Sequence, residues 1–167
     1  YKKSGSCKVL IVTGCMAQRY KNEIIDEVPE VDAVLGTTSY GDILKAVNEA
    51  MEGKHFQEFK DIDYLPEKLG KRVLTTGGHF GYLKIAEGCD KHCTYCIIPK
   101  LRGRFRSVPM ERLLEQAQEM AEQGVKELIL VAQETTVYGT DIYGKKSLHV
   151  LLKELCRIKG IRWIRVL

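Results

Sequence analysis

Three cysteines within eight residues constrain this chain more than any other feature of its sequence. Cys89, Cys93 and Cys96 have the spacing C-x-x-x-C-x-x-C, in a stretch that lies between Gly88 and Pro99. Thiolates this close together are soft ligands suited to an iron-sulfur cluster, zinc or copper(I). A cubane cluster takes four cysteines unless one iron accepts a ligand from elsewhere, so a set of three predicts a cluster with one open iron.

Two other interpretations compete with a cluster. The same spacing would place three buried thiols on one face of a helix, but the stretch is mostly polar and lies between a glycine and a proline, which favours a loop. Zinc bound by the three cysteines and His92 is the stronger competitor. Because His92 is adjacent to Cys93, and zinc sites usually take a second ligand pair from a distant segment, we favour the cluster.

Composition indicates an ordinary globular protein. The chain has 167 residues, of which 44% are hydrophobic and 29% are charged, enough for one core or two small ones. It begins YKKSGSCKVLIV, which contains neither a signal peptide nor an apolar run long enough for a membrane span, so we expect a cytoplasmic protein. The six cysteines of such a chain favour metal chemistry over disulfides.

A basic stretch follows the cysteines. The formal net charge is only +4, yet KLRGRFR (100–106) carries Lys100, Arg102, Arg104 and Arg106. Such a cluster attracts an acidic protein or a nucleic acid, or holds a carboxylate. A solvated basic loop explains any single one of these residues equally well.

The first third of the chain alternates between strand and helix patterns. We expect a strand over 8–13, a helix over 16–28 that ends before Pro29, a strand over 31–36, and a second helix that reaches Met51. Thr38, Ser39 or Asp42 is the candidate N-cap of that second helix. The pattern predicts a parallel α/β domain over 1–53, and because two strands cannot bury a parallel sheet, we expect further strands either before residue 1 or from elsewhere.

Residues 54–78 are irregular and are interpreted as a linker with one short strand near 72–75. A second α/β pattern occupies 79–167. Its strands are expected at 82–88, 125–133 and 161–167, its helices from Pro109 to Gly124 and over 148–158, and a loop over 136–147. Chemistry at the carboxyl end of its first strand fits either a βα barrel or an open doubly wound sheet.

Three stretches together resemble one known family. KIAEGCDKHCTYCIIPKLRGRFRS, ILVAQETTVYG and the strand WIRVL are similar to the radical S-adenosylmethionine methylthiotransferases, most of all to the group that modifies an aspartate of a small-subunit ribosomal protein. The upstream stretch KVLIVTGCMAQRY resembles the end of the family's N-terminal domain. The resemblance implies that 1–53 is the C-terminal part of that domain and that 79–167 forms the first βα units of a partial TIM-type barrel.

The resemblance also implies cofactors and their ligands. Cys89, Cys93 and Cys96 would hold a 4Fe-4S cluster whose open iron binds S-adenosylmethionine, and Cys15 would be a ligand of a second, auxiliary 4Fe-4S cluster. In the family the other two ligands of that cluster lie upstream of residue 1, so the chain looks like a fragment, and we do not expect it to be active alone. Tyr95 would pack near the adenine, although a core position is equally open, and Glu134, beside Gln133, would bind the ammonium group of S-adenosylmethionine.

The implied reaction starts with a 5′-deoxyadenosyl radical that removes a hydrogen from the β-carbon of the target aspartate. The auxiliary cluster supplies sulfur and a further S-adenosylmethionine supplies the methyl group. The implied partners are a small-subunit ribosomal protein and an electron-donor protein. Two alternatives remain: modification of a tRNA adenosine by a related enzyme group, and a zinc-stabilised module without catalysis. Cys156, on a helix between apolar residues, is interpreted as a core thiol.

Overall fold

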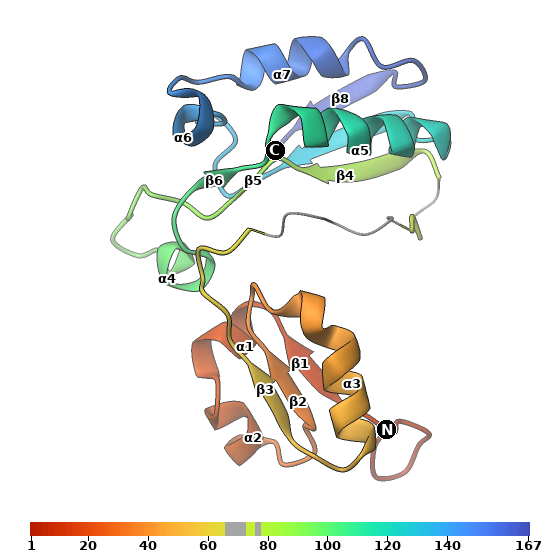
Figure 1. Cartoon of the computed structure of the whole chain (residues 1–167), viewed down its shortest axis with the longest axis vertical. Coiled ribbons are helices and arrows are strands. Elements are labelled where there is room, and N and C mark those ends of the chain that lie inside the picture. The colour runs from red at the N-terminus through yellow and green to blue at the C-terminus, as the bar shows by residue number, and fades with distance from the viewer. Residues whose placement is uncertain (66–72, 76–77) are drawn as a thin grey trace. The chain divides into compact units, whose positions relative to one another are not determined.

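The protein contains two compact α/β units. The computed structural model describes residues 1–65, 73–75 and 78–167 (Figure 1). The first unit comprises Tyr1–Leu65 together with the short segment Lys100–Arg102, and the second unit contains the other described residues. Each unit is built on its own three-stranded parallel sheet, so the mixed α/β class expected from the sequence is confirmed.

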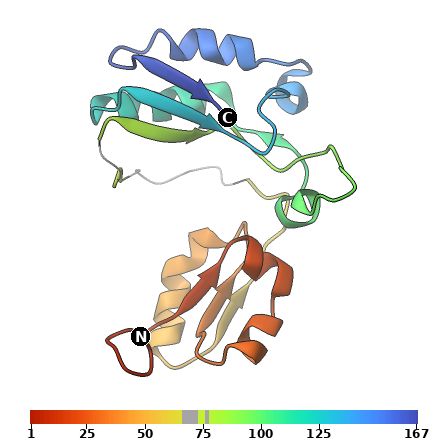
Figure 2. The same cartoon turned by 180° about the vertical axis from the view of Figure 1, so that it is seen from behind.

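The sheet of the first unit has the strand order β1-β2-β3, as seen from behind in Figure 2. Its central strand β2 is buried along its whole length because it has a neighbour on each side and a helix on each face. Val34 packs with Ala17 of the first helix, whereas Ala33 and Leu35 pack with Ala46 of the helix after β2. The strands are β1 (Ile11–Thr13), β2 (Ala33–Leu35) and β3 (Phe56–Glu58).

The helix predicted over 16–28 is in fact two short helices, α1 (Cys15–Tyr20) and α2 (Glu23–Glu27). Lys21 has a positive φ of 45°, which a continuing right-handed helix does not allow. The following helix, α3 (Ile43–Met51), comes after a 3₁₀ turn, η1 (Tyr40–Asp42). Asp42 occupies the predicted N-cap position without a side-chain cap hydrogen bond, and its carboxylate forms an ion pair with Lys60.

The segment interpreted as a linker contributes to the first unit. β3 pairs in parallel with β2, in the register Ala33 with Phe56 and Leu35 with Glu58, and so supplies the further strand that two strands alone require. The interpretation of 54–78 as irregular is therefore wrong at 56–58. The strand expected near 72–75 is not found at residues 73–75, and Arg72 lies outside the described residues.

The main strands and helices of the second unit follow one another in the order β4, α5, β7, α7 and β8, and its three-stranded sheet has the order β4-β7-β8 (Figure 1). All pairs are parallel, with Leu83 opposite Leu130 and Leu128 opposite Ile164. This arrangement agrees with the predicted βα units. The elements are β4 (Phe80–Lys84), α5 (Met110–Glu122), β7 (Glu127–Val131), α7 (Leu148–Leu155) and β8 (Trp163–Val166).

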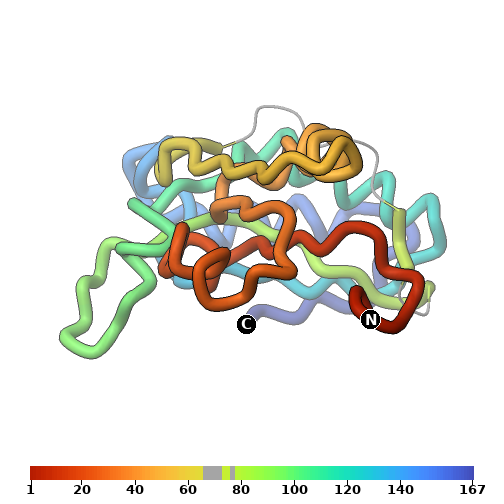
Figure 3. The backbone as a smooth tube through the Cα atoms, turned by 90° about the horizontal axis from the view of Figure 1, so that it is seen from below, coloured from red at the N-terminus to blue at the C-terminus, as the bar shows by residue number. Residues whose placement is uncertain are grey.

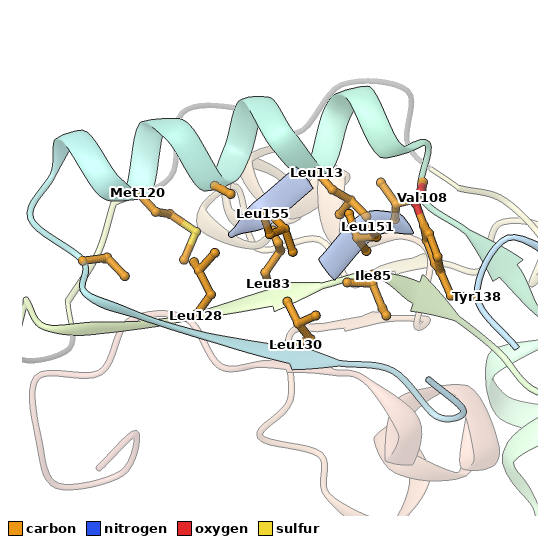
Figure 4. Packing of buried hydrophobic residues seen from close by; sticks show 12 residues of the cluster. Leu83, Ile85, Val108, Leu113, Met120, Leu128, Leu130, Tyr138, Leu151 and Leu155 are labelled. Atoms are coloured by element: carbon orange, nitrogen blue, oxygen red, sulfur yellow. Dashed lines mark hydrogen bonds between the residues drawn. The ribbon is translucent and has the colours of Figure 1, made fainter. Parts of the chain in front are cut away.

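The main core lies between this sheet and helices α5 and α7 (Figure 4). Alternate residues of β4 and β7, namely Leu83, Leu128 and Leu130, are fully buried there. The apolar positions of α5 recur at helical spacing and meet them, as the sequence pattern predicted. The buried α5 residues are Leu113, Ala117, Met120 and Ala121.

Three details of the second unit differ from the prediction. The strand expected over 82–88 is divided into β4 and a two-residue strand, β5 (Ala86–Glu87), which pairs antiparallel with β6 (Arg106–Ser107). The loop expected over 136–147 contains a helical turn, α6 (Thr140–Tyr143). Helix α7 ends at Leu155, so Cys156 is exposed and its assignment as a core thiol is wrong.

Candidate functional site

The cysteine loop begins and ends at the paired strands β5 and β6. Ala86 lies opposite Ser107, and this two-stranded ladder brings together chain segments about twenty residues apart. Gly88 follows β5 with φ +78°, and a Cβ atom at this position would lie 2.0 Å from the carbonyl oxygen of Arg104. A glycine is therefore required where the two sides of the loop approach each other.

Further hydrogen bonds fix the start of the loop. The backbone N–H of Cys89 donates to the carbonyl oxygen of Gly103 at 3.2 Å. One position along, the carboxylate of Asp90 accepts a hydrogen bond from the backbone N–H of Phe105 at 3.1 Å. Because Phe105 is itself buried, these two bonds hold Cys89 and Asp90 against the partly buried returning segment, residues 103–105.

Beyond Asp90 the loop extends away from the sheet of the second unit (Figure 3). Residues 88–97 form neither a helix nor a strand, so the predicted loop is confirmed. His92 has a positive φ of 46°, and the backbone N–H of Cys96 donates to the carbonyl oxygen of Cys93 at 2.9 Å, which makes a turn. The chain then enters α4 (Ile98–Arg102), with Pro99 in its first turn.

The three thiols of this loop are free and accessible. Cys89 and Cys96 are partly exposed, and Cys93 is exposed. Three thiols on one solvent-accessible loop fit a soft metal centre by the chemistry of the donor set. Among residues 1–65, 73–75 and 78–167, no three cysteine, histidine or carboxylate side chains are grouped closely enough to hold a metal ion as they stand.

The end of β7 lies against the start of the cysteine loop. The side-chain oxygen Oε1 of Gln133 accepts a hydrogen bond from the backbone N–H of Gly88 at 2.8 Å. The next residue, Glu134, forms an ion pair with Lys91. The structure therefore brings both residues proposed at the strand end to the loop that carries the cysteines, and it adds Lys91, to which the sequence analysis gave no role.

Glu134 is held as a carboxylate. Its oxygen Oε1 accepts hydrogen bonds from the backbone N–H of Thr136, at 3.1 Å, and from the Thr136 hydroxyl, while Oε2 faces Lys91. The hydrogen bond from Lys91, followed by the bond from the Thr136 side chain, lowers the pKa of Glu134 to about 2. The group is thus ionised near neutral pH and suited to binding a cation.

The other two predicted site residues, Tyr95 and Cys15, occupy different parts of the chain. Tyr95 lies at the turn of the loop and is 90% exposed, so the alternative of a core position is wrong. Cys15 begins α1 in the first unit, where its sulfur accepts a hydrogen bond from Nε of Arg102 at 3.2 Å.

Sequence reasoning missed the residues that support β6. Asp141 accepts hydrogen bonds from the backbone N–H of Ser107 at 2.7 Å and from the Ser107 hydroxyl at 2.6 Å, and the backbone N–H of Gly139 donates to the same hydroxyl at 2.9 Å. Tyr138 is fully buried and donates to the carbonyl oxygen of Val108 at 2.8 Å, and its burial raises the pKa of the phenol. No local pattern pointed to this network, because Ser107 and Asp141 are 34 positions apart in the chain.

Comparison with known proteins places the second unit in a family. Residues 83–167 match the Radical SAM superfamily, and the chain belongs to that superfamily. The superfamily implies the use of a 4Fe-4S cluster and S-adenosylmethionine. None of the helices in the described part of the chain is long and apolar enough to cross a membrane.

Curated relatives are similar to almost the whole chain. A protein named ribosomal protein uS12 methylthiotransferase RimO from Lachnoclostridium phytofermentans is 65% identical over 99% of this chain. Proteins of the same name from Clostridium botulinum and Clostridium perfringens are 54% and 51% identical over 100% of it. The chain spans 38% of the length of each of these relatives.

Proposed function

We propose that this chain is part of a methylthiotransferase that uses radical S-adenosylmethionine chemistry and acts on ribosomal protein uS12. The observation that carries the proposal is the loop with Cys89, Cys93 and Cys96, which starts beside a sheet of parallel βα units and lies against Gln133 and Glu134. The names of relatives 51–65% identical to the chain supply the substrate. The target is the β-carbon of an aspartate in that protein.

Cys89, Cys93 and Cys96 would hold the 4Fe-4S cluster. When bound, this group supplies the electron that cleaves S-adenosylmethionine. The residues around the loop would position the ligands and leave them accessible. The β5–β6 ladder and the Cys89 N–H bond to Gly103 fix the first ligand, while Cys93 stays accessible for assembly of the metal centre.

Cofactor binding would rest on the end of β7. Glu134 presents a fixed carboxylate to the ammonium group of S-adenosylmethionine, and Gln133 holds the loop beside it. Tyr95, exposed at the turn of the loop, is available to stack on the adenine. An ammonium group bound by a carboxylate gains a charge-assisted hydrogen bond.

The first unit would contribute to a second cluster through Cys15. The hydrogen bond from Nε of Arg102 would orient the Cys15 sulfur. This auxiliary cluster would provide the transferred sulfur, and a separate electron-donor protein would reduce the site. Because the proposed substrate is a ribosomal protein, we expect the reaction to take place in the cytoplasm.

The test is anaerobic reconstitution with iron and sulfide, metal analysis and reduction with dithionite, followed by electron paramagnetic resonance and by incubation of the reduced protein with S-adenosylmethionine and uS12. We expect a 4Fe-4S signal that S-adenosylmethionine perturbs, and, in protein of the relatives' full length, uS12 that gains one methylthio group by mass spectrometry. Cys93→Ala should abolish the cluster, whereas Cys156→Ala, which removes another exposed thiol, should not.

Three results would contradict the proposal. A colourless protein that retains one zinc ion would indicate a zinc-stabilised module. Methylthiolation of a tRNA adenosine, with RNA binding that weakens steeply as salt rises, would indicate the related RNA-modifying activity. Equal loss of the cluster in both cysteine variants would show that the ligands are assigned wrongly.

A further inference from the structure

We propose that Lys91 is a positioning residue that occupies the ammonium-binding oxygen of Glu134 in the resting protein and leaves it when S-adenosylmethionine binds. The inference rests on the proposed function, because it takes Glu134 as the partner of the cofactor amine. It adds that the ammonium group of Lys91 competes with S-adenosylmethionine for the Glu134 carboxylate, and it predicts that this competition lowers the affinity for the cofactor.

The two oxygens of the Glu134 carboxylate have different partners. Oε1 accepts both hydrogen bonds from Thr136, a residue of the same strand-end turn, and these bonds fix the orientation of the carboxylate. Oε2 is bound by the ammonium group of Lys91. The ammonium group of S-adenosylmethionine would therefore approach an oxygen, Oε2, that is already bound by the ammonium group of Lys91.

Exposure indicates which partner moves. The Glu134 side chain is only 14% exposed, whereas that of Lys91 is 57% exposed. The carboxylate is thus held by the protein, and the lysine reaches it from solvent on a flexible four-carbon stem. An ion pair with one exposed partner contributes little to stability, so an incoming ammonium group can replace it at low cost.

Departure of Lys91 leaves the base of the loop in place. Gly88 remains attached to Gln133, and Cys89 remains attached to Gly103. Lys91, by contrast, lies between the first two cysteines, beyond these contacts. The exchange would therefore release the outer part of the loop without loosening the position of the first cysteine.

The experiment measures the affinity of cluster-loaded protein for two ligands, S-adenosylmethionine and 5′-methylthioadenosine, which lacks the amino-acid part. Lys91→Met removes the competing ammonium group but keeps the stem, and we expect S-adenosylmethionine to bind about two- to fivefold more tightly. Affinity for 5′-methylthioadenosine should not change, because this ligand has no ammonium group to compete. Lys91→Arg should weaken S-adenosylmethionine binding, since a guanidinium group holds a carboxylate through two hydrogen bonds.

Lys54→Met is the matched control. The Lys54 side chain is 58% exposed and is ion-paired with Glu49 and Glu52 in the first unit, so its loss should leave both affinities at the wild-type value. Equal or weaker S-adenosylmethionine binding by Lys91→Met would overturn the exchange while leaving the proposed function intact. Failure of all variants and of the fully loaded wild type to bind S-adenosylmethionine would overturn both.

Discussion

The backbone N–H of Gly88 and the side-chain oxygen of Gln133 are joined by a hydrogen bond of 2.8 Å. Gly88 is the first residue after β5. Gln133 lies two positions after the end of β7, the central strand of the sheet in the second unit. The cysteine loop is therefore attached to the sheet in two ways: through the chain itself, which runs from β4 through β5 into the loop, and through the hydrogen bond to Gln133.

Replacing Gln133 by alanine should loosen the start of the loop. The Gly88 N–H loses its acceptor, and we expect the free energy of unfolding to fall by about 0.5–1.5 kcal/mol. Amide hydrogen exchange at Gly88 should become faster. Gln118→Ala, which removes an exposed glutamine that is hydrogen-bonded to Glu122 on the same helix, should change neither quantity measurably. Unchanged exchange at Gly88 in the Gln133 variant would show that the bond does not hold the loop.

Replacing Gly88 by alanine should be much more damaging. The backbone has a positive φ, and the new methyl group would lie 2.0 Å from the backbone oxygen of Arg104 on the other side of the loop. We expect a loss of at least about 2 kcal/mol in unfolding free energy by urea titration. Gly41→Ala is the control, because open space surrounds the added methyl group. Equal stability of the two variants would contradict the close approach.

The ion pair at Glu134 predicts a pH dependence. The pKa of Glu134 is lowered from 4.5 to about 2 in the folded protein, so its ionised form contributes stability above pH 4.5 that is lost as the pH falls from 4.5 towards 2. Carbon-13 NMR of the carboxyl group should show a midpoint near 2. In Lys91→Met the midpoint should rise, because the largest cause of the shift is removed. An unchanged midpoint would rule out the Lys91 contact in solution.

The Ser107–Asp141 hydrogen bonds should stabilise the loop stem. Asp141→Ala removes the acceptor for both the backbone N–H and the hydroxyl of Ser107, a residue that is only 2% exposed. A buried donor without a partner costs about 1–3 kcal/mol, so we expect a loss of that size in thermal or urea unfolding. Asp63→Ala, at an exposed position, is the control. If both substitutions have the same effect, β6 is not supported through Asp141.

The sequence alone determined the parts of this protein that depend on local pattern. Helix α5 follows from apolar residues at helical spacing, β7 from a continuous apolar run, and the cysteine loop from three thiols in a polar stretch between Gly88 and Pro99. The sequence alone predicts such features because the residues that define them are close together in the chain.

Tertiary structure decided what depends on distant partners. β3 contains one apolar residue in three and becomes a strand only because β2 offers it backbone partners. Lys91 and Glu134 are 43 positions apart and Ser107 and Asp141 are 34 apart, so no local pattern predicts either contact. The sequence named the thiols and, by resemblance, Gln133 and Glu134, whereas folding decided that Gln133 binds Gly88 and that Lys91 reaches Glu134, because parallel strands bring their carboxyl ends to one edge of the sheet.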